Sequence, residues 1–291
     1  MSILLGIINE GLIYALMALG VYITYSILDF PDLSVDSTFP LGAAATAALI
    51  IAGVPPILTL FLAFFAGALA GTVTGLIHVK LKVRDLLSGI IVMTGLYSVN
   101  LSIAGEKANL PIFSKDTIFE NDFISGLPEQ VSGVSTIIIL LIIVIAVKIL
   151  LDLYMKTRSG YLLRAAGDND TLVTSLAKDK GAVKILGLAL ANGLAALSGS
   201  VYCQQKGFFE ISTGTGTIVL GLASVIIGTK VFARFGKLKA TTAVILGTIV
   251  YKACVSAAMA MGFKTFYMKL ITSVLFLVIL VVSENGKKKV K

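Results

Sequence analysis

The chain has 291 residues, of which 57% are hydrophobic and only 14% are charged, and its mean hydropathy is +0.96. A water-soluble domain of this size does not hide so much apolar surface, so the composition excludes that class and indicates a polytopic α-helical membrane protein. The net charge of +8 does not indicate nucleic-acid binding, because the basic residues lie at the ends of apolar runs. No basic segment precedes the first apolar run, which therefore predicts a retained span and not a cleaved signal.

The apolar runs predict one all-α membrane domain over 1–291, a bundle of about eight or nine transmembrane helices. The second helix is predicted to be broken, because polar residues and prolines interrupt it. The predicted spans are, in chain order, roughly 4–28, 43–51 with the interrupted segment before it, 57–79, 86–103, 134–153, 185–203, 214–230, 241–260 and 268–283.

The interrupted segment, 28–42, is the least expected part of an apolar chain. It contains three carboxylates and two prolines, Pro31 and Pro40. A carboxylate at the centre of a lipid-facing helix costs roughly 2.5–3.5 kcal/mol, whereas a leucine or isoleucine returns only about 0.3–0.6 kcal/mol. Each proline also removes a backbone donor and biases the residue before it away from helix. We expect a broken segment that is shielded by protein or lines a polar cavity. The alternative is a short solvated turn between two helices.

Three groups of side chains are candidates for lining a passage. The first lies in the interrupted segment, the second falls at i, i+4 and i+7 on one face of the span 86–103, and the third is a lysine inside the span 241–260. The lysine is expected to pair with one of the aspartates or to face the same cavity, although a lysine can also extend toward an interface. The face on 86–103 is equally typical of helix–helix contact. The candidates are Asp29, Asp32, Ser34, Asp36, Ser37 and Phe39, then Met93, Tyr97 and Asn100, and finally Lys252.

Small residues predict close helix packing in the third span. Gly67, Gly71 and Gly75 recur at four-residue spacing and so lie on one helix face, where a neighbouring helix can approach closely. The spans at 185–203 and 214–230 are also rich in glycine and are expected to be interior helices.

The charge of the loops predicts the orientation of the chain. The loop 104–132 has two basic and five acidic residues, whereas the segment 155–184 has six basic and three acidic residues. By the positive-inside rule, the first loop is extracellular and the second is cytoplasmic, as is the lysine-rich C-terminus. The N-terminus is outside if the interrupted segment belongs to a full crossing and inside if that segment is re-entrant. The absence of basic side chains from the first two residues favours an outside N-terminus.

The cytoplasmic segment 155–184 has an amphipathic pattern that a plain connector does not need. Leu162, Leu163 and Ala166 can share one face of a short helix, and Asn169 or Asp170 can cap a second one. Two such helices outside the membrane would form a docking surface for another protein; the alternative is a simple connector.

Motifs for catalysis are missing from the sequence. One histidine, His78, and two cysteines on different spans, Cys203 and Cys254, do not form a metal site, and no Ser/His/Asp set or phosphate-binding loop is present. We therefore expect no enzyme activity, no metal and no cofactor. If the chain pumps a solute, another subunit must supply the energy.

Several stretches resemble the permeases of bacterial ATP-binding-cassette (ABC) importers. They are Gly11–Val21, Leu28–Asp36, Met93–Leu101, Gly105–Asn109 and Leu163–Asn169. The chain resembles the branched-chain amino acid and ribose permeases broadly. It is most similar to the smaller group often encoded with a tryptophan/tyrosine-type binding lipoprotein.

The resemblance implies a permease homodimer in the bacterial cell membrane, driven by two copies of an ATP-binding subunit and supplied by an extracellular solute-binding lipoprotein. It implies an amino acid substrate, aromatic or other, and places the coupling helix at about 160–174. Arg164, Gly167 and Asp168 match the family at that helix. The residues expected to contact the ATPase are Gly160, Leu163, Arg164, Gly167, Asp168 and Asp170.

Two other functions remain open at this point. In an ion-coupled secondary transporter, Asp29, Asp32, Asp36 and Lys252 would bind the driving ion or proton. The chain could also be a membrane scaffold that transports nothing. The amphipathic segment 155–184 favours the ABC permease, because a secondary carrier has no need of a docking surface for an ATPase.

Overall fold

The computed structural model describes residues 2–121, 129–168, 179–232, 238–261 and 267–288. Ten α-helices lie in these ranges, which confirms the predicted all-α membrane class. Seven helical segments are long and apolar enough to cross a membrane, and two shorter apolar helices, at Val35–Ile51 and Lys269–Val281, account for the remaining predicted spans.

The first helix crosses the whole bundle. It begins as α1 (Ser2–Val21) and continues as a π-helix, η1 (Tyr22–Ile27). Residues 28–34 are not helical, and α2 (Val35–Ile51) then returns in the opposite direction. The predicted break is therefore real but shorter than the segment 28–42. We call residues 28–34 the break.

Pro40 lies inside α2, so the expectation that the chain stays non-helical through Pro40 is wrong. Proline removes the hydrogen bond that would reach the Asp36 carbonyl four residues earlier. That carbonyl oxygen and the Pro40 ring both face Gly214, where a side-chain carbon would overlap them. The close contact with another segment accommodates a proline that local sequence rules would place outside a helix.

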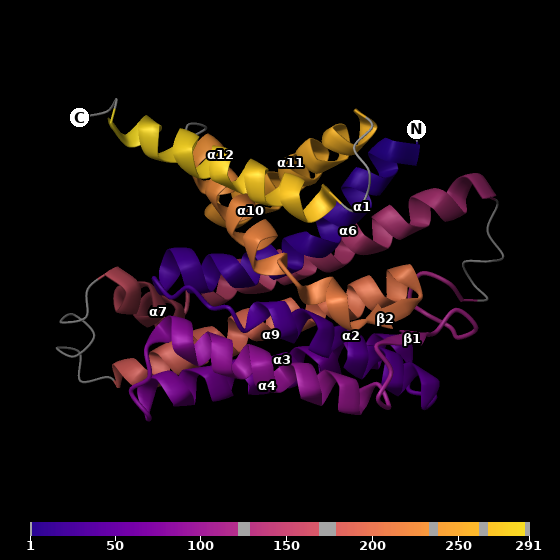
Figure 1. Ribbon diagram of the computed structural model, residues 1–291, viewed down its shortest axis with the longest axis horizontal. Coiled ribbons are helices and arrows are strands. Elements are labelled where there is room, and N and C mark those ends of the chain that lie inside the picture. The colour runs from indigo at the N-terminus through magenta and orange to yellow at the C-terminus, as the bar shows by residue number, and fades with distance from the viewer. Residues whose placement is uncertain (1, 122–128, 169–178, 233–237, 262–266, 289–291) are drawn as a thin grey trace.

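Helices α2, α3 (Pro56–Val79) and α9 (Lys180–Lys206) form the densest part of the bundle. Helix α4 (Asp85–Ile103) packs on α2 and α3, and the four helices occupy the lower part of Figure 1. The glycine face of α3 meets α9, as predicted: a side-chain carbon at Gly75 would lie 2.9 Å from the Ile185 Cα atom, and Gly71 faces the Leu188 carbonyl.

The second group of helices consists of α10 (Thr217–Val231), α11 (Ala240–Ala260) and α12 (Met268–Lys288). Helix α1 packs against α9 on one side and against α10 and α11 on the other, and α6 (Glu129–Tyr154) also contacts it. Figure 1 shows α1 and α6 between the two groups, with the start of α1 toward the right of the view and the end of α12 toward the left.

Helix α2 is shorter than a full crossing, and α10 reaches that length only together with the residues before it, in the apolar segment Ile211–Lys230. Fifteen residues of α-helix in α10 rise about 22 Å, less than the roughly 30 Å hydrocarbon core of a bilayer. The short 3-10 helix η2 (Ile211–Gly214) precedes α10 and packs against α2. Helix α10 therefore begins inside the bundle, where Thr217 is buried.

The two ends of the bundle differ. At one end, β1 (Asn109–Pro111) pairs antiparallel with β2 (Phe208–Glu210), a two-stranded sheet that the sequence did not predict. At the other end lies the short helix α7 (Arg158–Asp168), which packs against α9 and η1 (Figure 1). We call these the β end and the α7 end.

Candidate functional site

The break and the first turn of α2 place three aspartates in three different environments. Asp29 is exposed and has a left-handed backbone, with φ of 50°, at the turn that follows η1. Asp32 is buried, with 1% of its surface exposed, and Asp36 is half-buried in the first turn of α2. The three residues therefore do not form one acidic cluster, although their close spacing in the sequence placed them in one candidate group.

Asp32 is held by a buried polar network between the break and α9. Its Oδ1 accepts hydrogen bonds from the Ser34 backbone N–H at 2.9 Å and from the Ser34 hydroxyl at 2.6 Å. Its Oδ2 accepts from Asn192 Nδ2 at 2.7 Å. Thr38 donates to Asn192 Oδ1 at 2.7 Å. Donors thus satisfy both carboxylate oxygens, which is the condition for keeping a charged group out of water.

Asn192 is a functional candidate that the sequence analysis missed. It lies on α9, the helix that packs most closely with α3, and its hydrogen bond to Asp32 connects α9 to the break. The available signal was a single asparagine in a span otherwise rich in glycine, alanine and leucine, where a polar side chain needs a partner.

Asp36 caps the N-terminus of α10. Its carboxylate accepts hydrogen bonds from the backbone N–H groups of Gly216 at 2.9 Å and Ile218 at 2.8 Å, and from the Thr217 hydroxyl at 3.0 Å. These are the N–H groups that a helix leaves without internal partners, and the helix dipole favours an anion there. Asp36 therefore stabilises a helix that begins inside the bundle.

The three candidate residues on α4 differ in how deeply they are buried. Asn100 is buried and donates from Nδ2 to the Ser37 carbonyl at 2.9 Å, while its Oδ1 has no hydrogen-bond partner among the described residues. Met93 is half-buried, whereas Tyr97 is 51% exposed. Asn100 and Ser37 are thus brought together, and Tyr97 points away from the break.

Lys252 pairs with Glu10, not with an aspartate of the break as expected. Its Nζ lies 3.1 Å from Glu10 Oε2 and 4.0 Å from the centre of the Tyr14 ring. Lys206 Nζ contacts the other Glu10 oxygen at 3.2 Å. This cluster lies toward the β end, since Lys206 is the last residue of α9, just before β2. The aspartates of the break lie toward the α7 end and cannot reach it.

Aromatic rings adjoin this ion cluster. Tyr14 stacks on Phe39, with ring centres 5.5 Å apart and planes 8° apart, and Tyr202 packs against both rings. Phe39 therefore belongs with Glu10, Lys206 and Lys252, although it was grouped with the aspartates in the sequence.

Helix α7 is amphipathic, as predicted for the first part of 155–184. Leu163 and Ala166 are buried, whereas Tyr161 and Arg164 are exposed. Gly160 is buried against Tyr154 and Met155. The Asp168 side chain, Asp170 and the predicted second helix lie outside the described part of the structure.

Helix α7 contacts the chain where the break begins. Gly167 packs against the Ile27 carbonyl, so a side chain there would overlap that oxygen. Gly187 of α9 lies against methyl groups of Leu28 and Leu163, which would be 2.6 and 2.7 Å from a side-chain carbon at that position. Movement of α7 must therefore displace residues 27 and 28.

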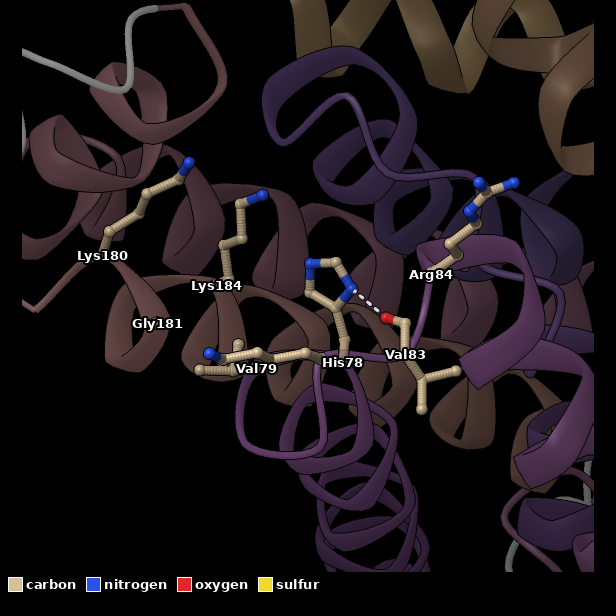
Figure 2. A pocket seen from close by; sticks show the side chains of 8 residues that line it. His78, Val79, Val83, Arg84, Lys180, Gly181 and Lys184 are labelled. Carbon is tan, nitrogen blue, oxygen red and sulfur yellow. Dashed lines mark hydrogen bonds between the residues drawn. The ribbon is translucent and has the colours of Figure 1, made fainter.

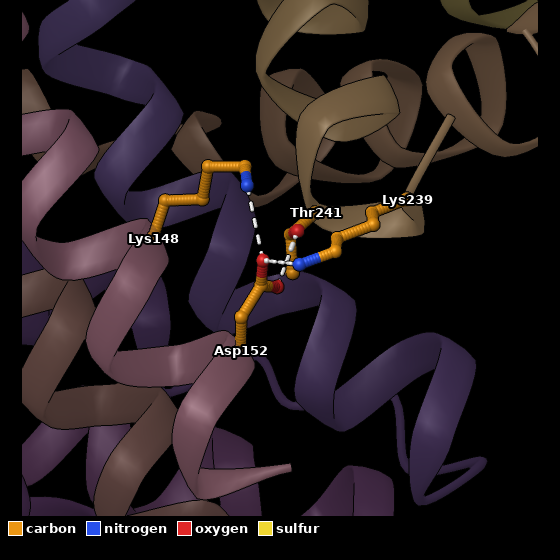
Figure 3. A network of polar contacts seen from close by, with 4 residues as sticks. All are labelled: Lys148, Asp152, Lys239 and Thr241. Carbon is orange, nitrogen blue, oxygen red and sulfur yellow. Dashed lines mark hydrogen bonds and ion pairs between the residues drawn. The ribbon is translucent and has the colours of Figure 1, made fainter. Parts of the chain in front are cut away.

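A second polar network joins helices near the α7 end (Figure 3). Asp152 of α6 accepts from Lys148 at 3.0 Å, from Lys239 at 3.1 Å and from the Thr241 hydroxyl at 2.7 Å. Lys239 and Thr241 flank the start of α11. The carboxylate therefore fastens α6 to the N-terminus of α11.

Within the described ranges, no group of three or more His, Cys, Asp or Glu residues could hold a metal ion. Cys203 and Cys254 are free thiols, the first buried and the second exposed. The residues that the structure assembles are suited to binding, capping and transmitting movement between helices.

A helical bundle with buried polar networks, discontinuous helices and an external amphipathic helix defines a multi-pass membrane permease. The sequence model of the family described as branched-chain amino acid transport system / permease component matches residues 3–283. The chain belongs to this family of ABC importer permeases.

Several curated proteins are similar over nearly the whole chain. A tyrosine transport system permease protein of Clostridioides difficile (strain R20291) is 43% identical over 280 residues, which cover 96% of this chain and 91% of that protein. An uncharacterized protein of Rickettsia prowazekii (strain Madrid E) is 33% identical, with 96% of each chain covered. A ribose import permease protein of Escherichia coli (strain K12) is 25% identical, with 98% and 86% covered. No solved structure matches the chain significantly.

Proposed function

We propose that this chain is the permease subunit of an ABC importer that moves tyrosine or another amino acid into a bacterial cell. Two copies of an ATP-binding subunit supply the energy, and an extracellular solute-binding lipoprotein delivers the solute. The proposal is supported by the family and by the 43% identity to a permease whose name specifies tyrosine transport.

The observation that carries the proposal is the contact between α7 and the break. The buried face of α7, with Leu163, holds the helix against Leu28 and Gly187, while Arg164 faces outward. A force applied by an ATPase to the exposed face would pass through Gly167 to Ile27 and so to the break. The proposed coupling residues remain Gly160, Leu163, Arg164, Gly167, Asp168 and Asp170.

In this proposal the α7 end is cytoplasmic. Basic residues gather there, as the positive-inside rule requires, and they include Lys82, Arg84, Lys180 and Lys184. The N-terminus is then proposed to lie outside and the C-terminus inside. In Figure 1 the start of α1 lies on the side of the β end and the end of α12 on the side of the α7 end.

We place recognition of the solute near the outer end, at the ion cluster and its aromatic rings. The side chains of Glu10 and Lys206 are 40% and 31% exposed. The Glu10 carboxylate can bind the α-ammonium group of an amino acid, and the Lys206 ammonium group can bind its α-carboxylate. Tyr202 is half-buried beside the buried rings of Tyr14 and Phe39, and its ring is the aromatic group that we propose meets a tyrosine side chain. The proposed path then passes Ser37 and Asn100 toward Asp36, Ser34, Asp32 and Asp29.

The exposed face of α4 is proposed to meet the second copy of the permease. Thr94, Tyr97 and Ser98 are exposed there together, an arrangement that is costly against lipid. Met93 lies beside them, half-buried. A passage between two copies would give these polar groups contact with water or with the solute.

Uptake by proteoliposomes tests the proposal. The chain is reconstituted with its ATP-binding subunit and its solute-binding lipoprotein, and entry of labelled tyrosine is measured with and without ATP, with leucine and ribose as competitors. ATP-dependent uptake that unlabelled tyrosine blocks supports the proposal. Uptake without ATP that an ionophore abolishes would instead indicate the ion-coupled transporter.

Arg164→Glu tests the coupling helix in the same assay. Arg164 is exposed, so the variant should insert and fold normally but lose ATP-driven uptake. Lys107→Glu, an equal charge reversal at the β end, is the matched control and should transport normally. Equal uptake by Arg164→Glu and the native chain would contradict the assignment of α7.

A further inference from the structure

A group of polar contacts between α6 and α11 is not used by the transport proposal. Figure 3 shows Lys148, Lys239 and Thr241 converging on the Asp152 carboxylate. Its Oδ2 accepts from Lys148 at 3.0 Å and from Lys239 at 3.1 Å, and its Oδ1 accepts from the Thr241 hydroxyl at 2.7 Å. Lys148 belongs to the same helix as Asp152, so the bonds from Lys239 and Thr241 are the ones that join α6 to α11. We call these four residues the Asp152 latch.

The Asp152 latch is a contact that can separate. Helices α6 and α11 make few contacts with each other, since α6 packs mainly on α1, and α11 packs on α1 and α10. The side chain of Asp152 is 13% exposed, whereas that of Lys239 is 61% exposed and stays largely in water. An ion pair with a well-hydrated partner contributes little net stability, because water takes the place of the lost contact. Such a contact fixes a geometry and can still open under a modest force.

The end of α6 is tied closely to α7, the proposed coupling helix. Only residues 155–157 separate the two helices. The hydroxyl groups of Tyr154 and Ser159 form a hydrogen bond of 2.9 Å across this connection. Gly160 packs so closely on the Tyr154 carbonyl that a side-chain carbon there would overlap it. Asp152 lies two residues before the end of α6, so we expect a displacement of α7 to pull on the latch.

The latch also lies near η1, the π-helix that leads into the break. Tyr22, the first residue of η1, is half-buried and lies within electrostatic range of both the Arg164 guanidinium and the Asp152 carboxylate. Turns of π-helix are rare and are frequent at functional sites. The latch, η1 and the exposed face of α7 are therefore neighbours at the α7 end.

The break itself is held firmly to α3. Phe30 is buried and packs edge-on against the His78 ring, with ring centres 5.0 Å apart. That ring is fixed in turn: His78 Nδ1 lies 2.9 Å from the Val83 carbonyl oxygen (Figure 2), and because a carbonyl only accepts, Nδ1 donates. A movement of α7 is thus taken up more easily at the hydrated latch than at this packed contact with α3.

We propose that the Asp152 latch is a conformational device that holds α6 on α11 in one state of the permease and opens in another. The ATP-binding subunit would open it through α7, and in that respect alone the inference rests on the proposed function. It does not depend on which solute is transported. Opening would release the first turn of α11 from α6, so that the bundle could change shape at the α7 end.

Distances between two spin labels test the latch while its four residues stay intact. The labels are attached at Ile149→Cys on α6 and Ala240→Cys on α11, both exposed positions, in a Cys254→Ser background because Cys254 is exposed. Double electron–electron resonance measures the distance in the full chain with its ATP-binding subunit, without nucleotide and with ATP and vanadate. Asp152→Asn, which removes the charge at nearly constant size, is then compared with Lys156→Gln, a change of an exposed lysine outside the latch.

We expect one short distance without nucleotide and a longer one with ATP and vanadate. Without nucleotide, Asp152→Asn should raise the ratio of long to short distances by about tenfold, and Lys156→Gln by less than about twofold. The latch is refuted if these two variants give the same distribution. A normal response to Asp152→Asn without any response to ATP would contradict the proposed coupling to an ATPase, not the latch. Lys239→Gln, a milder change at a largely exposed side chain, replaces Asp152→Asn if that variant does not fold.

Discussion

Asn192 on α9 donates a 2.7 Å hydrogen bond to the buried carboxylate of Asp32, 160 residues earlier in the chain. The same amide group accepts from Thr38 and also donates to the Leu188 carbonyl at 3.1 Å. One side chain therefore joins α9, the break and the first turn of α2, the elements that must move relative to one another if the permease alternates between two states.

Removal of this amide should destabilise the permease. Asn192→Leu leaves a buried carboxylate without one of its donors, and we expect the free energy of unfolding to fall by about 1.5–3 kcal/mol. The measurement is unfolding of the purified chain in mixed micelles. Thr94→Val, which removes an exposed hydroxyl bonded only to its own helix, should change stability by less than about 0.5 kcal/mol. If both variants lower the free energy of unfolding by a similar amount, the Asp32–Asn192 network does not stabilise the permease.

The cap of α10 predicts a smaller and more local effect. Asp36→Ala removes the acceptor of two backbone N–H groups and one hydroxyl, and caps of this kind are worth about 0.5–2 kcal/mol. Hydrogen exchange of the α10 amides should therefore accelerate more than that of α3. Asp29→Asn serves as the control, because Asp29 is exposed and asparagine tolerates its left-handed backbone. Unchanged exchange in α10 would contradict the capping role of Asp36.

The Glu10 cluster predicts which double variants interact. Glu10→Gln and Lys252→Met should be non-additive by about 0.5–3 kcal/mol, because each change removes the partner of the other. Glu10→Gln alone should cost more than Lys252→Met alone, since it leaves two lysines without a counter-charge.

A second double variant tests the pairing of Lys252 with an aspartate, which the sequence favoured. Asp36→Asn combined with Lys252→Met should be additive within about 0.5 kcal/mol, because Asp36 binds α10 and Lys252 binds Glu10. Strong coupling between Asp36 and Lys252 in uptake or stability would mean that the two residues meet in some working state.

The packing of α7 on Ile27 predicts a coupling defect from a small change. Gly167→Val would overlap the Ile27 carbonyl and push α7 away from the break, which we expect to cut ATP-driven uptake while membrane insertion stays normal. Gly6→Val is the control, because nothing lies within 4 Å of a side-chain carbon at Gly6. If ATP hydrolysis and uptake both stay normal in Gly167→Val, force does not pass through this contact.

Much of the fold could be read from local pattern. Apolar runs predicted the spans, the glycines of α3 predicted its face toward α9, and Leu163 and Ala166 predicted the buried side of α7. Each of these depends on composition or on the spacing of residues along one helix. These predictions are possible because a helix in lipid satisfies its own backbone hydrogen bonds, whichever helices it packs against.

The polar sites could not be predicted from the sequence, because each one forms by packing between segments that are distant in the chain. Asp29, Asp32 and Asp36 have the same side chain and similar neighbours in sequence, yet one is exposed, one is buried with Asn192 and one caps α10. Lys252 had several carboxylates as possible partners, and Pro40 was expected to end a helix that it occupies.

The sequence by itself determined that this chain is a helical membrane protein, that a polar segment interrupts its apolar runs after the first span, and that it carries an amphipathic helix at one end. Only the tertiary structure decided which carboxylate meets which donor. A hydrogen bond or ion pair requires atoms within about 3 Å, and helix packing alone brings together residues more than 150 positions apart in the chain.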